Sequence, residues 1–155
     1  MSELAVGGAA PDFDLDGDGG SRICLSGLRG SPVVVYFYPK DDTPGCTKEA
    51  IAFSGLEAEF AAIDTKIIGI SPDTAAKHDK FKAKHDLTVS LASDPEKETC
   101  EAYGVWVEKS MYGKKYMGVE RSTFLVDADG KLAQIWRKVK VPGHAEAVLE
   151  AARNL

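Results

Sequence analysis

The stretch Val33-Val-Val-Tyr-Phe-Tyr-Pro39-Lys-Asp-Asp-Thr43-Pro-Gly-Cys46 decides the fold of this chain. Its first six residues are apolar and rich in strand formers, and prolines border them on both sides. This pattern predicts a strand that is buried on both faces of a sheet. Beyond Pro44, apolar residues recur at helical spacing, at Ala50, Phe53, Leu56 and Phe60. We therefore expect a strand, a loop and a helix, with Cys46 in the first helical turn.

A cysteine in that position is set up for nucleophilic chemistry. The unpaired N–H groups and the positive dipole end of a helix start favour the thiolate form, which is the reactive form of cysteine. Thr43 stands where a disulfide exchanger of the Cys-x-x-Cys type would carry its other cysteine. The pattern therefore favours a thiol that reduces peroxides and argues against a general thiol-disulfide oxidoreductase.

Three further residues are candidates for the surroundings of this thiol. Thr43 lies three residues before Cys46, so its hydroxyl can reach the sulfur or a bound peroxide. Pro39 has no N–H group and can shield a thiolate from water. Arg121 opens a buried-type strand and stays charged at any working pH, which makes it the best candidate cation. We predict catalytic roles for Cys46, Thr43, Arg121 and Pro39, with no metal or organic cofactor.

Strands and helices alternate along the rest of the chain, and a hairpin and a helix close it. This order predicts an α/β fold, a thioredoxin-like sandwich with an added N-terminal β-hairpin. Within it, Gly55 is expected to split the first helix, and Ser71-Pro-Asp73 to cap the second one. The expected elements are a hairpin over 13–25, strands at 66–70 and 89–92, helices at 74–87 and 97–103, a hairpin at 109–118, a strand-turn-strand unit at 121–136 and a terminal helix at 143–154.

Composition narrows the class of protein and its surroundings. A chain of 155 residues that is 44% hydrophobic fits a single domain over 1–155. Three cysteines do not make a disulfide framework, and the first residues lack the pattern of a signal peptide, so we expect a cytoplasmic protein. No apolar run is long enough to span a bilayer, and the net charge of -5 disfavours nucleic acid or an anionic membrane as a partner.

These motifs together resemble one known family, the peroxiredoxins, in particular the peroxiredoxin Q or bacterioferritin comigratory protein subfamily. The similarity spans nearly the whole chain and is carried by Ala10-Pro-Asp-Phe13, Tyr36 to Ala50, Gly69-Ile-Ser-Pro-Asp73, Leu91-Ala-Ser-Asp94, Ala102-Tyr-Gly-Val-Trp106 and Gly118 to Asp127. The resemblance implies that Cys46 is the peroxidatic cysteine and that Pro39, Thr43 and Arg121 surround it. It also implies a monomer that reduces hydrogen peroxide or alkyl hydroperoxides, with thioredoxin or a similar dithiol protein as the reductant.

The chain departs from the subfamily in its resolving cysteine. Many members carry that cysteine five residues after the peroxidatic one, where this chain has Ile51, and others carry it in the helix that corresponds to 74–87, which has none here. We therefore expect a one-cysteine enzyme that is re-reduced by an external thiol, with Cys24 and Cys100 as packing residues. Two alternatives stay open: Cys100 as a resolving cysteine, and a non-enzymatic redox sensor that signals through Cys46.

The remaining residues that could carry chemistry have simpler interpretations. His78, His85 and His144 show no metal-ligand spacing with the cysteines, so we expect no metal site. His78 and His85 are interpreted as half-buried side chains beside Phe81. The aromatic residues Trp106 and Tyr112 could line a pocket for an organic hydroperoxide, although core positions are the more common use of such residues.

Overall fold

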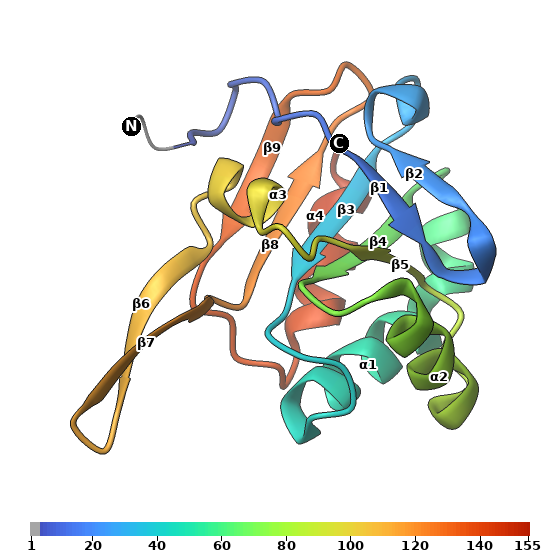
Figure 1. Ribbon diagram of the computed structural model, residues 1–155. Coiled ribbons are helices and arrows are strands. Elements are labelled where there is room, and N and C mark those ends of the chain that lie inside the picture. The colour runs from blue at the N-terminus through green and yellow to red at the C-terminus, as the bar shows by residue number, and fades with distance from the viewer. Residues whose placement is uncertain (1–3) are drawn as a thin grey trace.

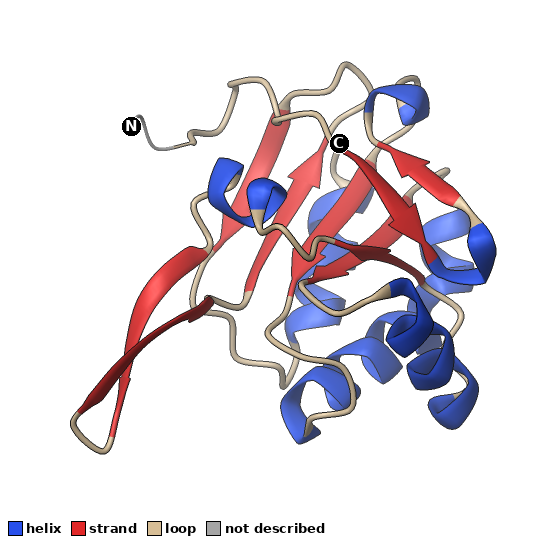
Figure 2. Ribbon diagram, in the orientation of Figure 1, coloured by secondary structure: helices blue, strands red, loops and turns tan. Residues whose placement is uncertain are grey.

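The computed structural model describes residues 4–155, which form a seven-stranded mixed sheet with helices packed on its two faces (Figures 1 and 2). The strands of this sheet run in the order β2-β1-β5-β4-β3-β8-β9. Strands β3, β4 and β5 are parallel, whereas β8 is antiparallel to β3 and β1 is antiparallel to β5. The strands are β1 (Asp14–Gly17), β2 (Arg22–Cys24), β3 (Val33–Phe37), β4 (Lys66–Ser71), β5 (Ser90–Ser93), β6 (Trp106–Met111), β7 (Lys114–Val119), β8 (Ser122–Val126) and β9 (Leu132–Trp136). The α-helices are α1 (Pro44–Ala61), α2 (Ala75–His85), α3 (Glu98–Ala102) and α4 (His144–Arg153).

The central strand β3 divides two hydrophobic cores. Successive side chains of a strand point to opposite faces, so Val34 and Tyr36 belong to one core and Val35 and Phe37 to the other. The first core lies between the sheet and the helices α1, α2 and α4. The second core contains α3 and the chain before β1. The predicted thioredoxin-like α/β fold and its N-terminal hairpin, formed by β1 and β2, are confirmed.

Two local predictions were wrong. Helix α1 runs through Gly55 without a break, because a single glycine only weakens a helix that the core already holds through Phe53 and Phe60. Helix α2 is capped by Thr74, whose hydroxyl oxygen accepts a hydrogen bond from the Lys77 N–H. The Ser71-Pro-Asp73 segment therefore does not supply the cap.

The strands β6 and β7 form a separate two-stranded arm that projects from the main body (Figure 1). The hairpin predicted at 109–118 is confirmed, and it extends further along the chain on both sides. Tyr112 sits in its turn and is 97% exposed, so the core position that the sequence favoured for this residue was wrong. Among residues 4–155, no helix combines the length and the apolar character needed to cross a bilayer.

Candidate active site

Cys46 lies in the first turn of α1, close to the carboxyl end of β3. Pro44 is the first residue of the helix, and its fixed φ angle suits that position. Thr43 precedes it as the N-cap residue, in an extended conformation. The Cys46 side chain is buried and belongs to the core formed with α1, α2 and α4. The placement that the sequence predicts, in the first helical turn after a buried strand, is therefore confirmed.

A guanidinium group faces the sulfur. Arg121 donates from Nη2 to the Cys46 Sγ at 3.3 Å, although the two residues are 75 positions apart. Strand pairing explains the approach: β8 is antiparallel to β3, with Ser122 opposite Phe37, so the residue before β8 lies beside the loop after β3. Gly45 leaves room for the guanidinium, because a Cβ atom at this position would lie 3.1 Å from Nη2.

The same guanidinium is held by a buried carboxyl group. Arg121 donates from Nη1 to Glu49 Oε1 at 2.7 Å, and Glu49 is only 1% exposed. Burial raises the pKa of Glu49 to about 7, against the opposing influence of Arg121. Burial also works against the charge of Arg121, but Glu49 and then Cys46 outweigh it and raise the pKa of the guanidinium. Glu49 therefore orients the cation that faces the thiol.

Glu49 was not among the residues predicted from the sequence. The signal was nevertheless present, because Glu49 follows Cys46 by three residues and such a pair shares one face of a helix. Its Oε2 atom is buried and has no hydrogen-bond partner, which is costly for a polar atom away from water. A buried, partly satisfied carboxyl beside a cation and a thiol is typical of a functional site.

Burial and the charge of Arg121 lower the pKa of two further basic side chains. Burial, and then Arg121, lower the pKa of Lys109, which lies on β6. Burial and Arg121 also lower the pKa of His144 to about 4, so its imidazole is neutral near pH 7. The Nε2 atom of His144 lies 2.8 Å from the Thr123 hydroxyl oxygen. Of these three basic side chains, Arg121 is the one that contacts the Cys46 sulfur.

Thr43 and Pro39 lie in the segment that connects β3 to the helical turn of Cys46. The Thr43 hydroxyl donates to the backbone carbonyl of Lys40 at 2.9 Å, so its proton is not directed at the sulfur. The hydroxyl oxygen keeps lone pairs that can accept a hydrogen bond from a peroxide O–H. Pro39 follows Tyr38 at the end of the central strand and is partly exposed.

The other two cysteines lie away from this site. Cys100 is fully buried in α3, in the core on the opposite side of the sheet from Cys46. Burial and the carboxylate of Asp94 raise the pKa of the Cys100 thiol well above its usual value. Cys24 ends β2 at one edge of the sheet, where its Sγ lies 3.2 Å from the Ser26 hydroxyl oxygen. All three cysteines are free thiols.

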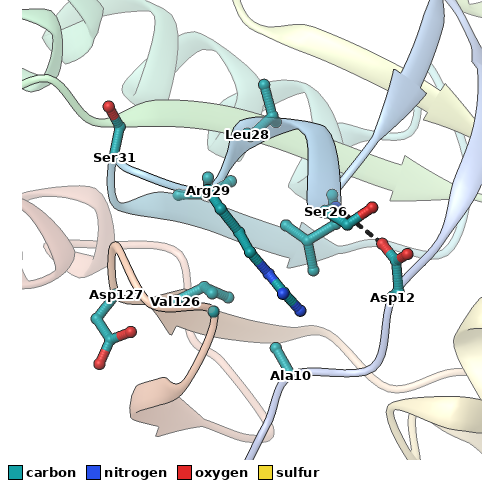
Figure 3. Close-up of a pocket in the computed structure, with 11 residues that line it drawn as sticks. Ala10, Asp12, Ser26, Leu28, Arg29, Ser31, Val126 and Asp127 are labelled. Atoms are coloured by element: carbon teal, nitrogen blue, oxygen red, sulfur yellow. Dashed lines mark hydrogen bonds between the residues drawn. The ribbon is translucent and has the colours of Figure 1, made fainter.

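A surface hollow at the other end of β3 does not belong to this site. Figure 3 shows Arg29 extending into the hollow between Val126 and Ala10, with the Ser26 N–H bonded to Asp12 Oδ1 at 2.9 Å. A Cβ atom on Gly130 would come within 3.0 Å of Arg29 Nε, so the arginine packs closely against that glycine. No cysteine lines the hollow, which leaves the end of β3 near Cys46 as the candidate active site.

The histidines show one correction. His78 is fully buried instead of half-buried, and its Nδ1 lies 2.6 Å from the carboxylate of Asp41. His85 is partly exposed, as predicted. Within the described part of the chain, no three His, Cys, Asp or Glu side chains gather in a way that could hold a metal ion.

The fold is that of a thioredoxin-like protein, with one buried cysteine facing a guanidinium, and known proteins resemble the chain over nearly its whole length. The AhpC/TSA family matches residues 6–135. Peroxiredoxin Bcp of Bacillus subtilis strain 168 is 48% identical over 152 residues, which cover 98% of this chain and 97% of the relative.

Solved structures agree with this similarity. The bacterioferritin comigratory protein of Xanthomonas campestris, described in terms of its alkyl peroxide reduction activity, superposes with a TM-score of 0.90 at 44% identity and covers 99% of this chain and 98% of its own. A cysteine-to-serine mutant of PrxQ from Xylella fastidiosa superposes with a TM-score of 0.93 at 37% identity, with the same coverage. The chain therefore belongs to the AhpC/TSA family, as a peroxiredoxin of the Bcp or PrxQ type. Its activity is that of a thiol peroxidase.

Proposed function

We propose that Cys46 is the peroxidatic cysteine and that the enzyme reduces hydrogen peroxide and organic hydroperoxides. The observation that carries this proposal is the 3.3 Å contact between Arg121 Nη2 and the Cys46 sulfur in a buried first helical turn. A permanent cation at that distance can stabilise negative charge that develops on the reacting atoms. The alkyl peroxide reduction described for the Xanthomonas campestris relative supports organic hydroperoxides as substrates.

The reaction takes place in one displacement. The Cys46 thiolate attacks the terminal peroxide oxygen, the S–O bond forms as the O–O bond breaks, and the leaving alkoxide or hydroxide takes up a proton. Cys46 becomes a sulfenic acid. Arg121 and the N–H groups of the first helical turn stabilise the negative charge that develops on the leaving oxygen. Thr43 accepts a hydrogen bond from the peroxide through its free lone pairs, and Pro39 limits access of water to the sulfur.

We propose further that the sulfenic acid is reduced by an external thiol, with thioredoxin or a similar dithiol protein as the physiological reductant. A disulfide needs Cα atoms within about 7 Å. Cys100 lies in the core on the other side of the sheet, and Ile51 occupies the position one helical turn beyond the site. The proposal includes a monomeric enzyme, one domain over 1–155, working in the reducing cytoplasm.

Peroxide consumption with thioredoxin or dithiothreitol as the reductant tests the proposal. The wild type should turn over many times, Cys46→Ser should consume none, and the matched control Cys24→Ser should retain activity. A single oxidation without turnover would instead support the redox sensor.

Mapping the oxidised protein tests the one-cysteine assignment separately. After one equivalent of peroxide, dimedone should label Cys46 in the wild type and in Cys100→Ser equally. A rapid disulfide between Cys46 and Cys100 in the wild type, replaced by the dimedone adduct in Cys100→Ser, would make Cys100 the resolving cysteine.

A further inference from the structure

His78 is a buried titratable side chain that the proposed reaction does not use. It lies on α2, is 0% exposed, and its two ring nitrogens face two different acceptors. Nδ1 lies 2.6 Å from Asp41 Oδ2, and Nε2 lies 2.9 Å from the backbone carbonyl oxygen of Ala92 on β5. Buried polar atoms need partners, and here both nitrogens have one.

The two acceptors determine how the ring is used. A carbonyl oxygen cannot donate, so Nε2 carries a proton and donates to Ala92. Nδ1 lies 2.6 Å from Asp41 Oδ2, so the second ring nitrogen also has an oxygen partner. The other carboxylate oxygen, Asp41 Oδ1, accepts from the Tyr38 hydroxyl at 2.6 Å. This arrangement fully satisfies a carboxyl group that is only 6% exposed.

Asp41 belongs to the loop that leads from β3 to Cys46, so the pair connects α2 to that loop. The backbone N–H of Asp41 donates to Asp73 Oδ2 at 2.7 Å, directly before α2. The next residue, Asp42, has a φ of 62°, in the left-handed region that non-glycine residues seldom adopt. Its carboxylate accepts from Lys84 and His85, both in the last turn of α2. The loop therefore depends on α2 for its conformation.

The conformation of this loop determines where the first turn of α1 begins. Thr43 is tied back to the loop by its hydrogen bond to the Lys40 carbonyl, and its own carbonyl accepts the helical hydrogen bond from the Thr47 N–H at 2.9 Å. Arg121 is positioned by its place before β8, and it bonds Glu49 in the second turn of α1, beyond the turn that the loop leads into. A shift of the loop would therefore move the sulfur relative to the guanidinium.

We propose that His78 is a positioning residue for Cys46, acting through Asp41 to hold the loop over 38–43 and the first turn of α1 against Arg121. This inference rests on the proposed function, because it concerns the geometry of the same thiol. His78 does not touch the sulfur or the peroxide. Its effect is on the rate at which Cys46 reacts, since a displacement of about 1 Å in an active site can cost on the order of 100-fold in rate.

Two substitutions of His78 separate positioning from simple packing. The amide nitrogen of Asn stands at about the place of Nδ1 and can still donate to Asp41, whereas that of Gln stands at about the place of Nε2 and reaches only Ala92. We expect His78→Gln to lower the second-order rate constant for Cys46 oxidation by hydrogen peroxide by roughly 10- to 100-fold. His78→Asn should restore it to within about threefold of wild type.

Two further variants complete the design. Asp41→Ala removes the carboxylate that His78 contacts, so it should lower the rate constant as much as His78→Gln does. The double variant should show no further decrease in the rate constant. Leu132→Ala, in the core on the other face of the sheet, loses stability without touching the loop and should keep the wild-type rate constant at a temperature where it is folded. Asp41→Ala and His78→Asn decide the question even where His78→Gln fails to fold.

The outcomes are distinguishable from one another. Equal loss in His78→Gln and His78→Asn, or independent effects of His78 and Asp41, would reduce the pair to packing and overturn the inference. An unchanged rate constant in His78→Gln, His78→Asn and Asp41→Ala would overturn it as well. Peroxide turnover that survives in Cys46→Ser would instead overturn the proposed function, and this inference with it.

Discussion

Cys46 and Cys100 are almost equally buried, yet the charged groups beside them are of opposite sign. Both side chains are almost completely buried, one in each of the two cores that flank the central sheet. Cys46 faces the guanidinium of Arg121, whereas Cys100 lies beside the carboxylate of Asp94, whose Oδ2 accepts a hydrogen bond from the Cys100 backbone N–H. A cation favours a thiolate and an anion disfavours it. The two sulfurs are almost equally buried, so the sign of the neighbouring charge is the difference between them that bears on the proposed role of Cys46.

The helices that carry the two cysteines also differ in length. Helix α1 is 18 residues long, and its N-terminus points at the loop after β3, so its unpaired N–H groups lie near Cys46. Helix α3 has only five residues, and Cys100 is its third. Its peptide dipoles are too few to offset burial and the Asp94 charge.

The largest expected effect is that of replacing the Cys46 sulfur with oxygen, and the same replacement at Cys100 is the comparison. Cys46→Ser should lose all measurable reaction with peroxide, because a serine hydroxyl is not ionised near neutral pH. Cys100→Ser should keep wild-type kinetics within about threefold, because the residue supplies only packing. Stopped-flow measurement of peroxide consumption compares the two. A large loss in Cys100→Ser, in a protein that remains folded, would contradict the distinction between the two cores.

Removing the cation should make Cys46 resemble Cys100. Arg121→Met should slow oxidation of Cys46 by roughly 100-fold, since one charged donor to a transition state is worth about that much. The rate of its alkylation by iodoacetamide should fall as well, because the cation no longer faces the sulfur. Arg29→Met, in the hollow at the other end of β3, is the matched control and should leave both values unchanged. Identical kinetics in the two variants would show that Arg121 does not assist the thiol.

Glu49 should make the free energy of unfolding depend on pH. Its pKa is raised from 4.5 to about 7, so the folded state binds its proton more tightly than the unfolded state. Stability from this group is therefore complete below pH 4.5 and declines by ~3 kcal/mol as the pH rises to about 7. His144 acts in the opposite direction, because its pKa is lowered to about 4 and stability rises as the pH increases from 4 to 6.5.

The two groups offset each other in the wild type, so Glu49→Gln should reveal the His144 dependence. Urea unfolding of Glu49→Gln should show stability that rises with pH between 4.5 and 6.5, more steeply than in the wild type. Glu59→Gln, an exposed carboxyl on the same helix, serves as the control and should follow the wild-type profile. Parallel profiles for Glu49→Gln and wild type would mean that Glu49 titrates normally.

The smallest expected effect is on the inert thiol. Asp94→Asn removes the charge beside Cys100 and keeps an oxygen to accept its backbone N–H. The pKa of Cys100 should fall but stay above its usual value, because burial is the larger cause of the shift. Alkylation of Cys100 as a function of pH measures this. Peroxide kinetics at Cys46 should not change, and a change would connect the two cores.

Local patterns in the sequence were sufficient for the fold and for the position of the nucleophile. The run Val33–Tyr38, Pro44 and the helical spacing from Ala50 to Phe60 place Cys46 in a first helical turn, because strand and helix preferences act between near neighbours. The missing cysteine at Ile51 is likewise visible without a structure. The orientation of Thr43, by contrast, depends on a loop conformation that short-range patterns do not determine.

Only the tertiary structure determines the contacts between distant segments of the chain. The pairing of β3 with β8 brings Arg121 to Cys46 across 75 residues, and the packing of α1 and α3 on opposite faces of the sheet puts Cys46 and Cys100 in different cores. The link from His78 to Asp41 spans 37 residues and depends on how α2 packs against the loop. Sheet register and helix packing determine these distances, and they place a cation beside one buried thiol and a carboxylate beside the other.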